Sequence, residues 1–408
     1  MADPYALYLH IPFCKAKCAY CDFDSRALHG CALEAAMDAY VAQLFALIDR
    51  HGASGELARV QTVYIGGGTP SLLGGRLVEL VQRVCGYCSP VEFTCEANPE
   101  SFDLELARAL HANGVTRISL GVQSLNADEL RQIGRIHTAE QAMLAVSQAK
   151  AIGFSTSCDV MCGLPGQTLD TFAATLRSLL ALDPDHVSVY PLQLEEGTPL
   201  ASMEESGELE VPDEDFQARC MDLAADLLQG QGYARYEVAS YAKPDHRCLH
   251  NISYWTGRPY LGLGRSAASM CDLETGAGSA GPALGVDSVR PDRPGCLALG
   301  LHAPLRIGSH RIRYVQLDDE GEKFDIEELT EREAAAEDLM LACRMADGIS
   351  PELLSRAERA IPRAELAIAC ERAVESGLAA WEAGRLKPTH LGWLEGNELF
   401  GVFWGLAE

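Results

Sequence analysis

A regular alternation of short apolar strands and helical segments restricts the fold of this chain more than any other feature. Six strand–helix units follow one another within about 200 residues, which predicts parallel strands with helices outside them. Six units are fewer than the eight of a closed barrel, so we expect an α/β fold built on an open, partial (βα)6 barrel. The predicted strands cover residues 5–10, 61–65, 91–95, 117–121, 154–161 and 186–194, and the predicted helices include 34–50, 102–112, 126–133, 139–152 and 168–182.

Three cysteines follow the first predicted strand directly. Cys14, Cys18 and Cys21 have the spacing C-x3-C-x2-C, which suits thiolates that close around one compact metal centre. A [4Fe–4S] cluster usually takes four cysteines, so three without a nearby fourth predict one iron open to a ligand from outside the protein. Zinc is the alternative, but the run lacks the second ligand pair of most zinc sites. Three buried thiols are the structural alternative.

Other polar residues stand at the ends of the later strands, where folds of this kind collect their functional groups. Gly66–Pro70 would let backbone amides approach a ligand, and without a following Gly-Lys-Ser/Thr it is no P-loop. We expect this segment to bind an amine or a carboxylate. A tight turn alone would explain one or two of its three glycines. Glu96 and Asp159 would bind ribose hydroxyls or an ammonium group; the alternative for each is a solvated strand end or a helix cap. Gln123 and Arg135 would add an amide and a cation, and a surface role is equally compatible with Arg135.

The second half of the chain has a different organisation. A helix over 213–230 precedes a polar loop, and residues 272–310 are rich in Gly, Ala and Pro, which predicts an irregular, mobile connection. We expect a barrel domain over 1–232, a connecting region over 233–310 and a smaller, mainly helical domain over 311–408. In that last domain we expect helices at 330–346, 350–357 and 363–376, then a strand pair near 387–391 and 399–404 with Asn397 in its turn.

Composition excludes several classes of partner. The formal charge of −25, from 58 acidic and 33 basic residues, argues against nucleic acid and against docking on anionic lipid, although peripheral contact with a membrane protein is compatible with it. No signal peptide and no uninterrupted apolar run of about 20 residues is visible. With 15 cysteines, these features predict a reducing compartment, the cytoplasm.

The remaining cysteines have simpler interpretations. Cys85 and Cys88 form a C-x2-C pair near a helix end, for which buried thiols are favoured over half a zinc site or a redox pair. The other isolated cysteines are expected to be small buried hydrophobes; they are Cys31, Cys95, Cys158, Cys220, Cys343 and Cys370.

His250 has two aromatic residues close by in the sequence, Tyr254 and Trp255. An imidazole in such surroundings can be an axial haem ligand, but a lone histidine in a loop is more often an ordinary polar residue. The residues alone favour the ordinary role.

Two motifs together resemble a known family. Tyr-Leu-His-Ile-Pro-Phe-Cys (residues 8–14) with C-x3-C-x2-C resembles the radical S-adenosylmethionine (SAM) superfamily, in its oxygen-independent coproporphyrinogen oxidase-like branch. Within it, the chain is most similar to the HemW-type haem chaperones. The oxidases carry a fourth cysteine where this chain has Phe23, and HemW-type chains carry the His-Asn-x-x-Tyr-Trp motif found at residues 250–255. After Gly264 relatives continue Gly-Ala-His-Ser, whereas this chain reads Arg-Ser-Ala-Ala-Ser.

The resemblance implies roles for these residues. The three cysteines would hold the [4Fe–4S] cluster, whose open iron takes the amino and carboxylate groups of SAM, and His250 would bind haem. It implies a haem chaperone that delivers haem to respiratory haem proteins. The alternatives are coproporphyrinogen III oxidation and radical chemistry on another tetrapyrrole; we expect no oxidase activity. The positions that match SAM contacts in the family are Tyr8, Gly67, Gly68, Thr69, Glu96, Gln123, Arg135 and Asp159.

Overall fold

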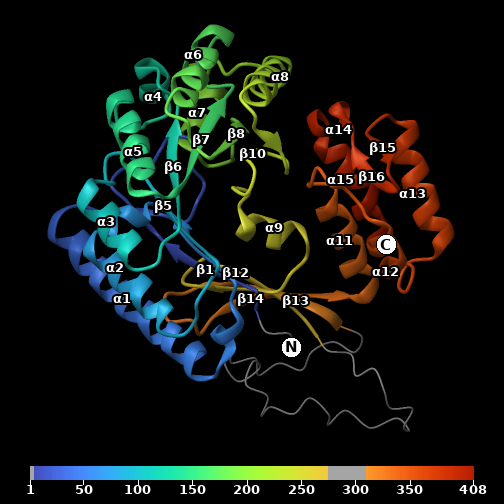
Figure 1. The fold of residues 1–408 in the computed structure, drawn as a ribbon, viewed down its shortest axis with the longest axis horizontal. Coiled ribbons are helices and arrows are strands. Elements are labelled where there is room, and N and C mark those ends of the chain that lie inside the picture. Colours follow the sequence, from blue (N-terminus) through green and yellow to red (C-terminus); the bar gives the residue numbers. More distant parts are fainter. Residues whose placement is uncertain (1–3, 274–308) are drawn as a thin grey trace.

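The computed structural model describes residues 4–273 and 309–408, and its centre is a sheet in which six parallel strands lie in chain order (Figure 1). Their neighbours in the sheet pair in parallel, for example Tyr8 with Tyr64 and Glu96 with Ser119. The predicted partial (βα)6 barrel is therefore confirmed. The six strands are β1 (Ala6–Ile11), β4 (Thr62–Gly67), β5 (Glu92–Ala97), β6 (Arg117–Gln123), β7 (Ser155–Cys162) and β8 (His186–Pro191).

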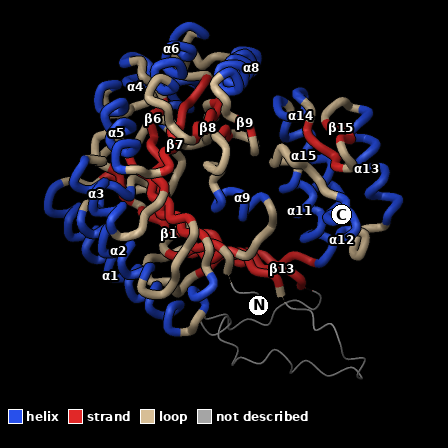
Figure 2. Tube along the Cα trace, in the orientation of Figure 1, coloured by secondary structure: helices blue, strands red, loops and turns tan. Residues whose placement is uncertain are grey.

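The helices between these strands cover the outside of the sheet (Figures 1 and 2). Local sequence signals set their ends. For example, α5 begins at a capping box formed by Thr138 and Gln141 and ends at Gly153, which adopts a left-handed conformation. These helices are α1 (Gly30–Ala53), α2 (Gly75–Cys85), α3 (Leu104–Ala112), α4 (Ala127–Gln132), α5 (Ala139–Ile152) and α6 (Leu169–Leu180); α7 (Pro199–Glu205) and α8 (Glu214–Gly230) follow β8.

Helix α1 is the only described helix with the length and composition of a membrane span. Its buried residues, among them Met37, Tyr40 and Leu44, belong to the main hydrophobic core. Alanines such as Ala35, Ala39 and Ala42 lie on its exposed face and raise its mean hydropathy. The packing of this helix on the barrel accounts for its apolar composition.

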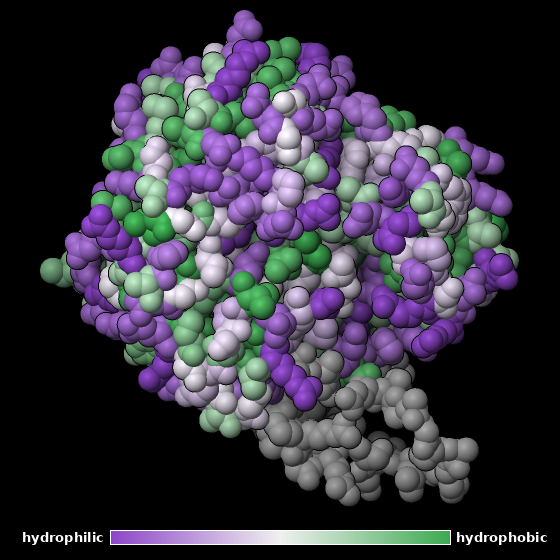
Figure 3. All heavy atoms as spheres, in the orientation of Figure 1, coloured by the Kyte–Doolittle hydropathy of each residue, from purple (hydrophilic) through white to green (hydrophobic). Residues whose placement is uncertain are grey.

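Hydrophilic and apolar side chains are interleaved over the face of the molecule seen in Figure 3.

The sheet continues beyond the barrel on both sides, to twelve strands in all among the described residues. On one side β11 (Tyr260–Leu263) pairs in parallel with β1, and β12 (Ala268–Asp272), β13 (Ser309–Gln316) and β14 (Phe324–Thr330) follow in antiparallel order. On the other side β8 pairs with β10 (Ser240–Ala242), which pairs with β9 (Ala234–Arg235). The short helix α9 (Leu249–Trp255) crosses from one side to the other (Figure 1).

The C-terminal part has a hydrophobic cluster of its own, built mainly from helices that start at Glu331. They are α11 (Glu331–Ala342), α12 (Pro351–Ala357), α13 (Arg363–Glu375), α14 (His390–Leu394) and α15 (Gly396–Trp404). This confirms the smaller, mainly helical part of the predicted fold, while the domain boundaries stay a prediction. Of the predicted connection over 272–310, residues 274–308 lie outside the described residues.

The predicted C-terminal strand pair is wrong. The hairpin consists of β15 (Ala379–Glu382) and β16 (Arg385–Pro388), and residues 399–404 lie in helix α15, which begins next to Asn397. The apolar run of this segment buries Leu399, Phe400 and Phe403 on one helical face. A short apolar run does not separate strand from helix, and here packing on the C-terminal cluster favours the helix.

Candidate cofactor site

A cavity of about 480 Å³ lies at the C-terminal ends of the barrel strands and contains most of the predicted site residues. All three cysteines of the N-terminal motif line it. The strand-end positions that line it with them are Gly67, Gly68, Thr69, Glu96, Gln123, Arg135 and Asp159. The structure thus brings ten of the twelve predicted site residues to one cavity; Tyr8 and His250 do not line it.

The cysteine loop contacts polar groups from two later segments, the turn after β4 and the loop after α4. The Thr69 hydroxyl donates to Cys14 Sγ at 3.5 Å, and Arg135 Nη1 donates to Cys18 Sγ at 3.6 Å. The Thr69 donor favours the thiolate form of Cys14, the form that binds metal. Burial nevertheless raises the pKa of both Cys14 and Cys21, so without a bound cation these thiols keep their protons at neutral pH.

The three thiols come from one loop and line the same cavity. In a [4Fe–4S] cluster, each cysteine binds a different iron. Thiol donors from one loop, facing one cavity, fit such a cluster.

Gly68 permits the close approach of the glycine-rich turn to the cysteine loop. A Cβ atom at this position would lie 2.7 Å from the carbonyl oxygen of Phe13 and 3.0 Å from Cys14 Sγ. Gly67 adopts a φ of +111°, which side chains rarely tolerate. Gly68 is thus required by the close approach of this turn to the cysteine loop, and Gly67 by the conformation of the turn itself.

Glu96 is held at the cavity wall by two donors. The Tyr64 hydroxyl donates to Oε1 at 2.8 Å, and the Gly67 amide donates to Oε2 at 3.0 Å. Burial raises the pKa of Glu96 to about 7, and these two donors only partly oppose the shift. The free carboxylate is therefore costly, and a ligand that offers hydroxyl or ammonium donors would stabilise it.

Gln123 and Arg135 each leave a buried polar atom without a protein partner. Gln123 has a φ of +64°, a strained conformation for a residue that is not glycine, and its Oε1 is buried and unpaired. Arg135 donates to Asn98 Oδ1 at 2.9 Å, while its Nε stays unpaired. Such orphaned groups at one cavity fit a polar ligand that supplies their partners.

Asp159 lies on β7 and is half-buried at the cavity wall. Ser119 donates to its two carboxylate oxygens at 3.2 and 3.4 Å, and burial raises its pKa. Sequence reasoning missed Ser119 as a site residue, and also Asn98, which donates to the Thr69 hydroxyl at 3.1 Å. Ser119 carried a usable signal, because it lies two residues before Gly121 on the same face of strand β6.

A polar clamp that sequence reasoning also missed fixes the cysteine loop from behind. Arg265 Nε and the Ser266 hydroxyl donate to one carboxylate oxygen of Asp24, at 2.6 and 2.7 Å. Arg26 pairs with Asp319 at 3.1 Å. The partners are about 240 and 290 residues apart in the chain, so only the fold brings them together.

His250 lies at the opposite, N-terminal end of the barrel strands. Its side chain is only 1% exposed, Nδ1 is bonded to the Thr62 hydroxyl at 3.1 Å, and Nε2 to the Tyr254 hydroxyl at 2.9 Å. Burial lowers the pKa of His250 to about 3, so the imidazole is neutral. The carboxylate of Glu92 accepts from the backbone amides of Leu249 and His250 at 2.8 and 2.9 Å, and so holds α9 against the barrel.

Tyr64 connects the two ends of the barrel interior. Its hydroxyl reaches Glu96, and its ring centroid lies 5.1 Å from that of His250. Tyr8 stacks on Tyr64 with a centroid distance of 6.2 Å and is bonded through its hydroxyl to His10 Nδ1 at 3.1 Å. Tyr8 therefore supports the wall of the cavity through Tyr64.

Most of the remaining cysteines follow their predicted interpretation, but Cys31 and Cys85 are exposed where buried thiols were expected. Cys95, Cys158, Cys220, Cys343 and Cys370 are buried, as expected. Cys31 is exposed because it lies on the outer face of the first turn of α1, so the prediction that it is buried is wrong.

The two thiols of the Cys85–Cys88 pair each donate to a backbone carbonyl oxygen. Cys88 is buried and donates to the Val84 carbonyl at 3.5 Å, whereas Cys85 is exposed and donates to the Asn113 carbonyl at 3.7 Å. Each thiol thus contacts a backbone oxygen.

Comparisons with known proteins agree with this site. The Radical SAM superfamily model matches residues 8–179. Heme chaperone HemW of Escherichia coli (strain K12) is 38% identical over 269 residues, which are 65% of this chain and 69% of that protein. This chain belongs to the HemW family of radical SAM proteins. Heme chaperone HemW of Bacillus subtilis (strain 168) is 29% identical over 405 residues, 98% of both chains.

A solved structure extends the likeness to the whole fold. Coproporphyrinogen III oxidase (HemN) from Escherichia coli, a radical SAM enzyme, has a TM-score of 0.75 and covers 98% of this chain and 90% of its own. Its sequence identity is 20%, so the likeness concerns the fold alone. The C-terminal helices therefore belong to the shared architecture together with the barrel.

Proposed function

We propose that this protein is a haem chaperone on a radical SAM scaffold, which binds haem and passes it to respiratory haem proteins. The observation that carries the proposal is the cavity that joins the cysteine loop to the polar strand ends, in a chain of the HemW family. Its cofactors are a [4Fe–4S] cluster, SAM and haem.

Cys14, Cys18 and Cys21, which line the cavity, would hold the cluster. When bound and reduced, cluster and SAM supply one-electron chemistry that releases a 5′-deoxyadenosyl radical. The protein contributes the surroundings. The Arg135 guanidinium donates to Cys18 Sγ, and Gly68 keeps the neighbouring turn in contact with the loop.

SAM is recognised by polar groups on four strand ends. The Glu96 and Asp159 carboxylates accept hydrogen bonds from hydroxyl or ammonium groups, and the unpaired atoms of Gln123 and Arg135 find their partners on the ligand. Gly67, Gly68 and Thr69 supply the close backbone approach, and Tyr8 supports the wall through Tyr64.

Haem binding at His250 requires α9 to leave the barrel. In the described conformation both ring nitrogens are hydrogen-bonded and the side chain is buried, so neither nitrogen is free for an iron. Movement of α9 breaks the bonds to Thr62 and to Glu92 and exposes the imidazole. Haem loading is thus coupled to the release of one short helix.

The oxidase alternative is disfavoured at the position of its fourth cysteine. Phe23 occupies that position, lines the cavity and is 57% exposed. It offers an apolar ring in place of a thiol. We therefore expect no conversion of coproporphyrinogen III to protoporphyrinogen in an anaerobic assay with reduced cluster and SAM; such conversion would contradict the chaperone function.

The direct test is a haem titration of the cluster-reconstituted protein, followed by absorbance. The wild type should show an imidazole-ligated spectrum that His250→Ala lacks, and His390→Ala, whose side chain is 71% exposed, should behave like the wild type. A His250→Ala variant that binds haem with unchanged spectrum and affinity would disprove the ligand assignment. Transfer of the bound haem to an apo-cytochrome then tests delivery.

A further inference from the structure

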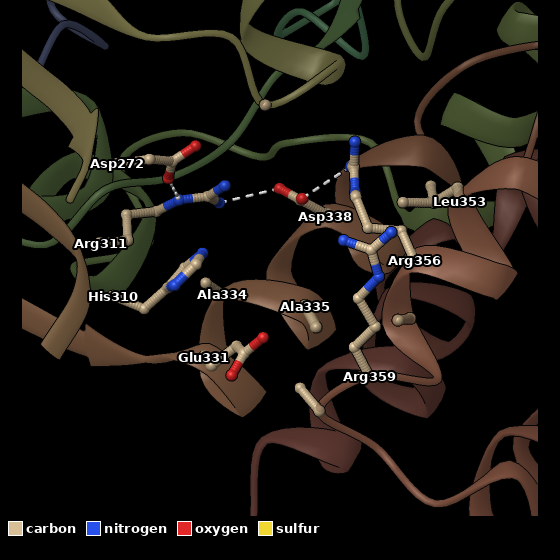
Figure 4. A pocket seen from close by; sticks show the side chains of 13 residues that line it. Asp272, His310, Arg311, Glu331, Ala334, Ala335, Asp338, Leu353, Arg356 and Arg359 are labelled. Carbon is tan, nitrogen blue, oxygen red and sulfur yellow. Dashed lines mark hydrogen bonds and ion pairs between the residues drawn. The ribbon is translucent and has the colours of Figure 1, made fainter. Parts of the chain in front are cut away.

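A second cavity lies outside the barrel, where strands β12 and β13 meet helices α11 and α12 (Figure 4). Its volume is about 190 Å³, room for a group of a few heavy atoms. The lining is rich in charge: Asp272 and Arg311 lie on one side, Arg356 and Arg359 on the other, and Asp338 between Arg311 and Arg356. None of these residues takes part in the cofactor site.

Most of this charge is neutralised within the protein. Arg311 is only 2% exposed and pairs with Asp272 at 2.8 Å, Glu337 at 2.7 Å and Asp338 at 2.8 Å. Asp338 also accepts from Arg356 at 2.9 Å. The acidic side chains of this network are thus already occupied by two arginines.

Two polar groups of the lining have no partner among the described residues. The Nδ1 atom of His310 is buried without a hydrogen-bond partner, and it donates in the tautomer that carries the proton there. Among the residues that the structure describes, Arg359 has no ion pair, although its guanidinium extends toward the same cavity as that of Arg356 (Figure 4). A buried donor without an acceptor is costly, and neighbouring guanidinium groups repel each other. An anionic group between His310 and Arg359 would relieve both costs.

The cavity adjoins the haem motif. Its lining includes Gly257, directly after α9, and a Cβ atom there would lie 2.5 Å from Asp338 Oδ1. Seven residues separate Gly257 from His250, which is roughly 10 Å along a helix. A ligand that contacts the released α9 can therefore reach this cavity with an acidic arm.

We propose that this cavity binds a carboxylate group, with Arg359 and His310 as its donors. Two sources have this chemistry: a propionate side chain of haem, which rests on the proposed function, and a free short-chain carboxylic acid. Arginine suits either, because its guanidinium donates two parallel hydrogen bonds to a carboxylate. The exposed carboxylate of Glu331 lines the same cavity and repels a bound anion. Removal of its charge should therefore strengthen carboxylate binding, whereas removal of the Arg359 charge should weaken it.

The experiment compares three variants of the full-length, cluster-reconstituted protein in titrations with haem and with haem dimethyl ester, which lacks the free carboxylates. Arg359→Ala should weaken haem binding about tenfold and leave ester binding unchanged, and Glu331→Gln should tighten haem binding. Arg363→Ala, an 88% exposed arginine nearby, is the matched control and should change neither. Equal effects of Arg359→Ala on haem and ester, or weaker haem binding by Glu331→Gln, would overturn the haem source.

A separate measurement tests the cavity without haem. Sodium propionate, at constant ionic strength, should raise the melting temperature of the wild type and of Arg363→Ala but not that of Arg359→Ala. If this dependence is seen while haem and its ester bind equally, the ligand is a free carboxylic acid. If propionate stabilises all variants alike, the carboxylate site itself is disproved. If the wild type binds neither haem nor haem dimethyl ester, the proposed chaperone function is contradicted. The melting temperatures in sodium propionate then decide by themselves whether the cavity binds a carboxylate.

Discussion

The contact between Glu92 and α9 makes a quantitative prediction about access to His250. Glu92 is 7% exposed, and its carboxylate accepts from two amides in the first turn of α9. It also attracts the buried Arg117, which is 3% exposed. Glu92→Gln keeps the shape of the side chain and removes its charge, so Arg117 loses a counter-ion and an amide group faces the α9 amides.

The magnitude follows from these contacts. Hydrogen bonds to a charged group contribute about 1.5–3 kcal/mol each, so the two from α9 together contribute about 3–6 kcal/mol. Because the amide oxygen of Gln keeps part of the bonding, we expect the anchoring of α9 to weaken by about 3 kcal/mol. This corresponds to roughly a hundredfold increase in the population of the released helix.

Hydrogen exchange of the peptide over residues 249–255 measures that population directly, since local opening sets the exchange rate of protected amides. The rate should rise up to a hundredfold in Glu92→Gln and stay unchanged in Glu79→Gln, a control at an exposed glutamate of α2. Haem association should accelerate in the same variant if release of α9 limits loading. Exchange within threefold of the wild type would refute the anchoring role, and faster exchange with unchanged haem association would refute the coupling.

Three further predictions concern the cofactor cavity. Gly68→Ala should lose the cluster on reconstitution, because its Cβ would lie 3.0 Å from Cys14 Sγ, whereas Gly75→Ala, with open space around it, should keep iron and sulfide at the wild-type level. Glu96 has a pKa raised from 4.5 to about 7, so its protonated form stabilises the fold below pH 4.5 and this contribution is lost as the pH rises through 7. In urea unfolding, the free energy of unfolding of the wild type should therefore fall by about 3 kcal/mol more between pH 5 and 8 than that of Glu96→Gln. If the free energies of both proteins depend on pH in the same way, the pKa shift of Glu96 is contradicted. Asp24→Asn weakens the clamp behind the cysteine loop and should raise the oxygen sensitivity of the cluster several-fold, measured by the decay of its visible absorbance; equal decay rates would argue against the clamp.

The barrel and most of the cofactor cavity could be predicted because their signals are local. Strand–helix alternation sets parallel strands side by side, and parallel strands bring all their C-terminal ends to one edge. Polar residues in the C-terminal halves of those strands, such as Glu96 on β5 and Asp159 on β7, are therefore assembled by the topology itself. The cysteine spacing acts over eight residues of one loop, so it needs no tertiary information.

Only the tertiary structure decided the features that join distant parts of the chain. The Asp24–Arg265 clamp and the anchoring of α9 by Glu92 each pair residues more than 150 positions apart, and no periodicity in the sequence specifies such partners. The same limit explains the C-terminal error, where packing selected a helix for a short apolar run. His250 shows the division most clearly. Its motif was readable in the sequence, but its burial beneath Tyr254, at the end of the barrel opposite the cysteines, follows from how α9 packs.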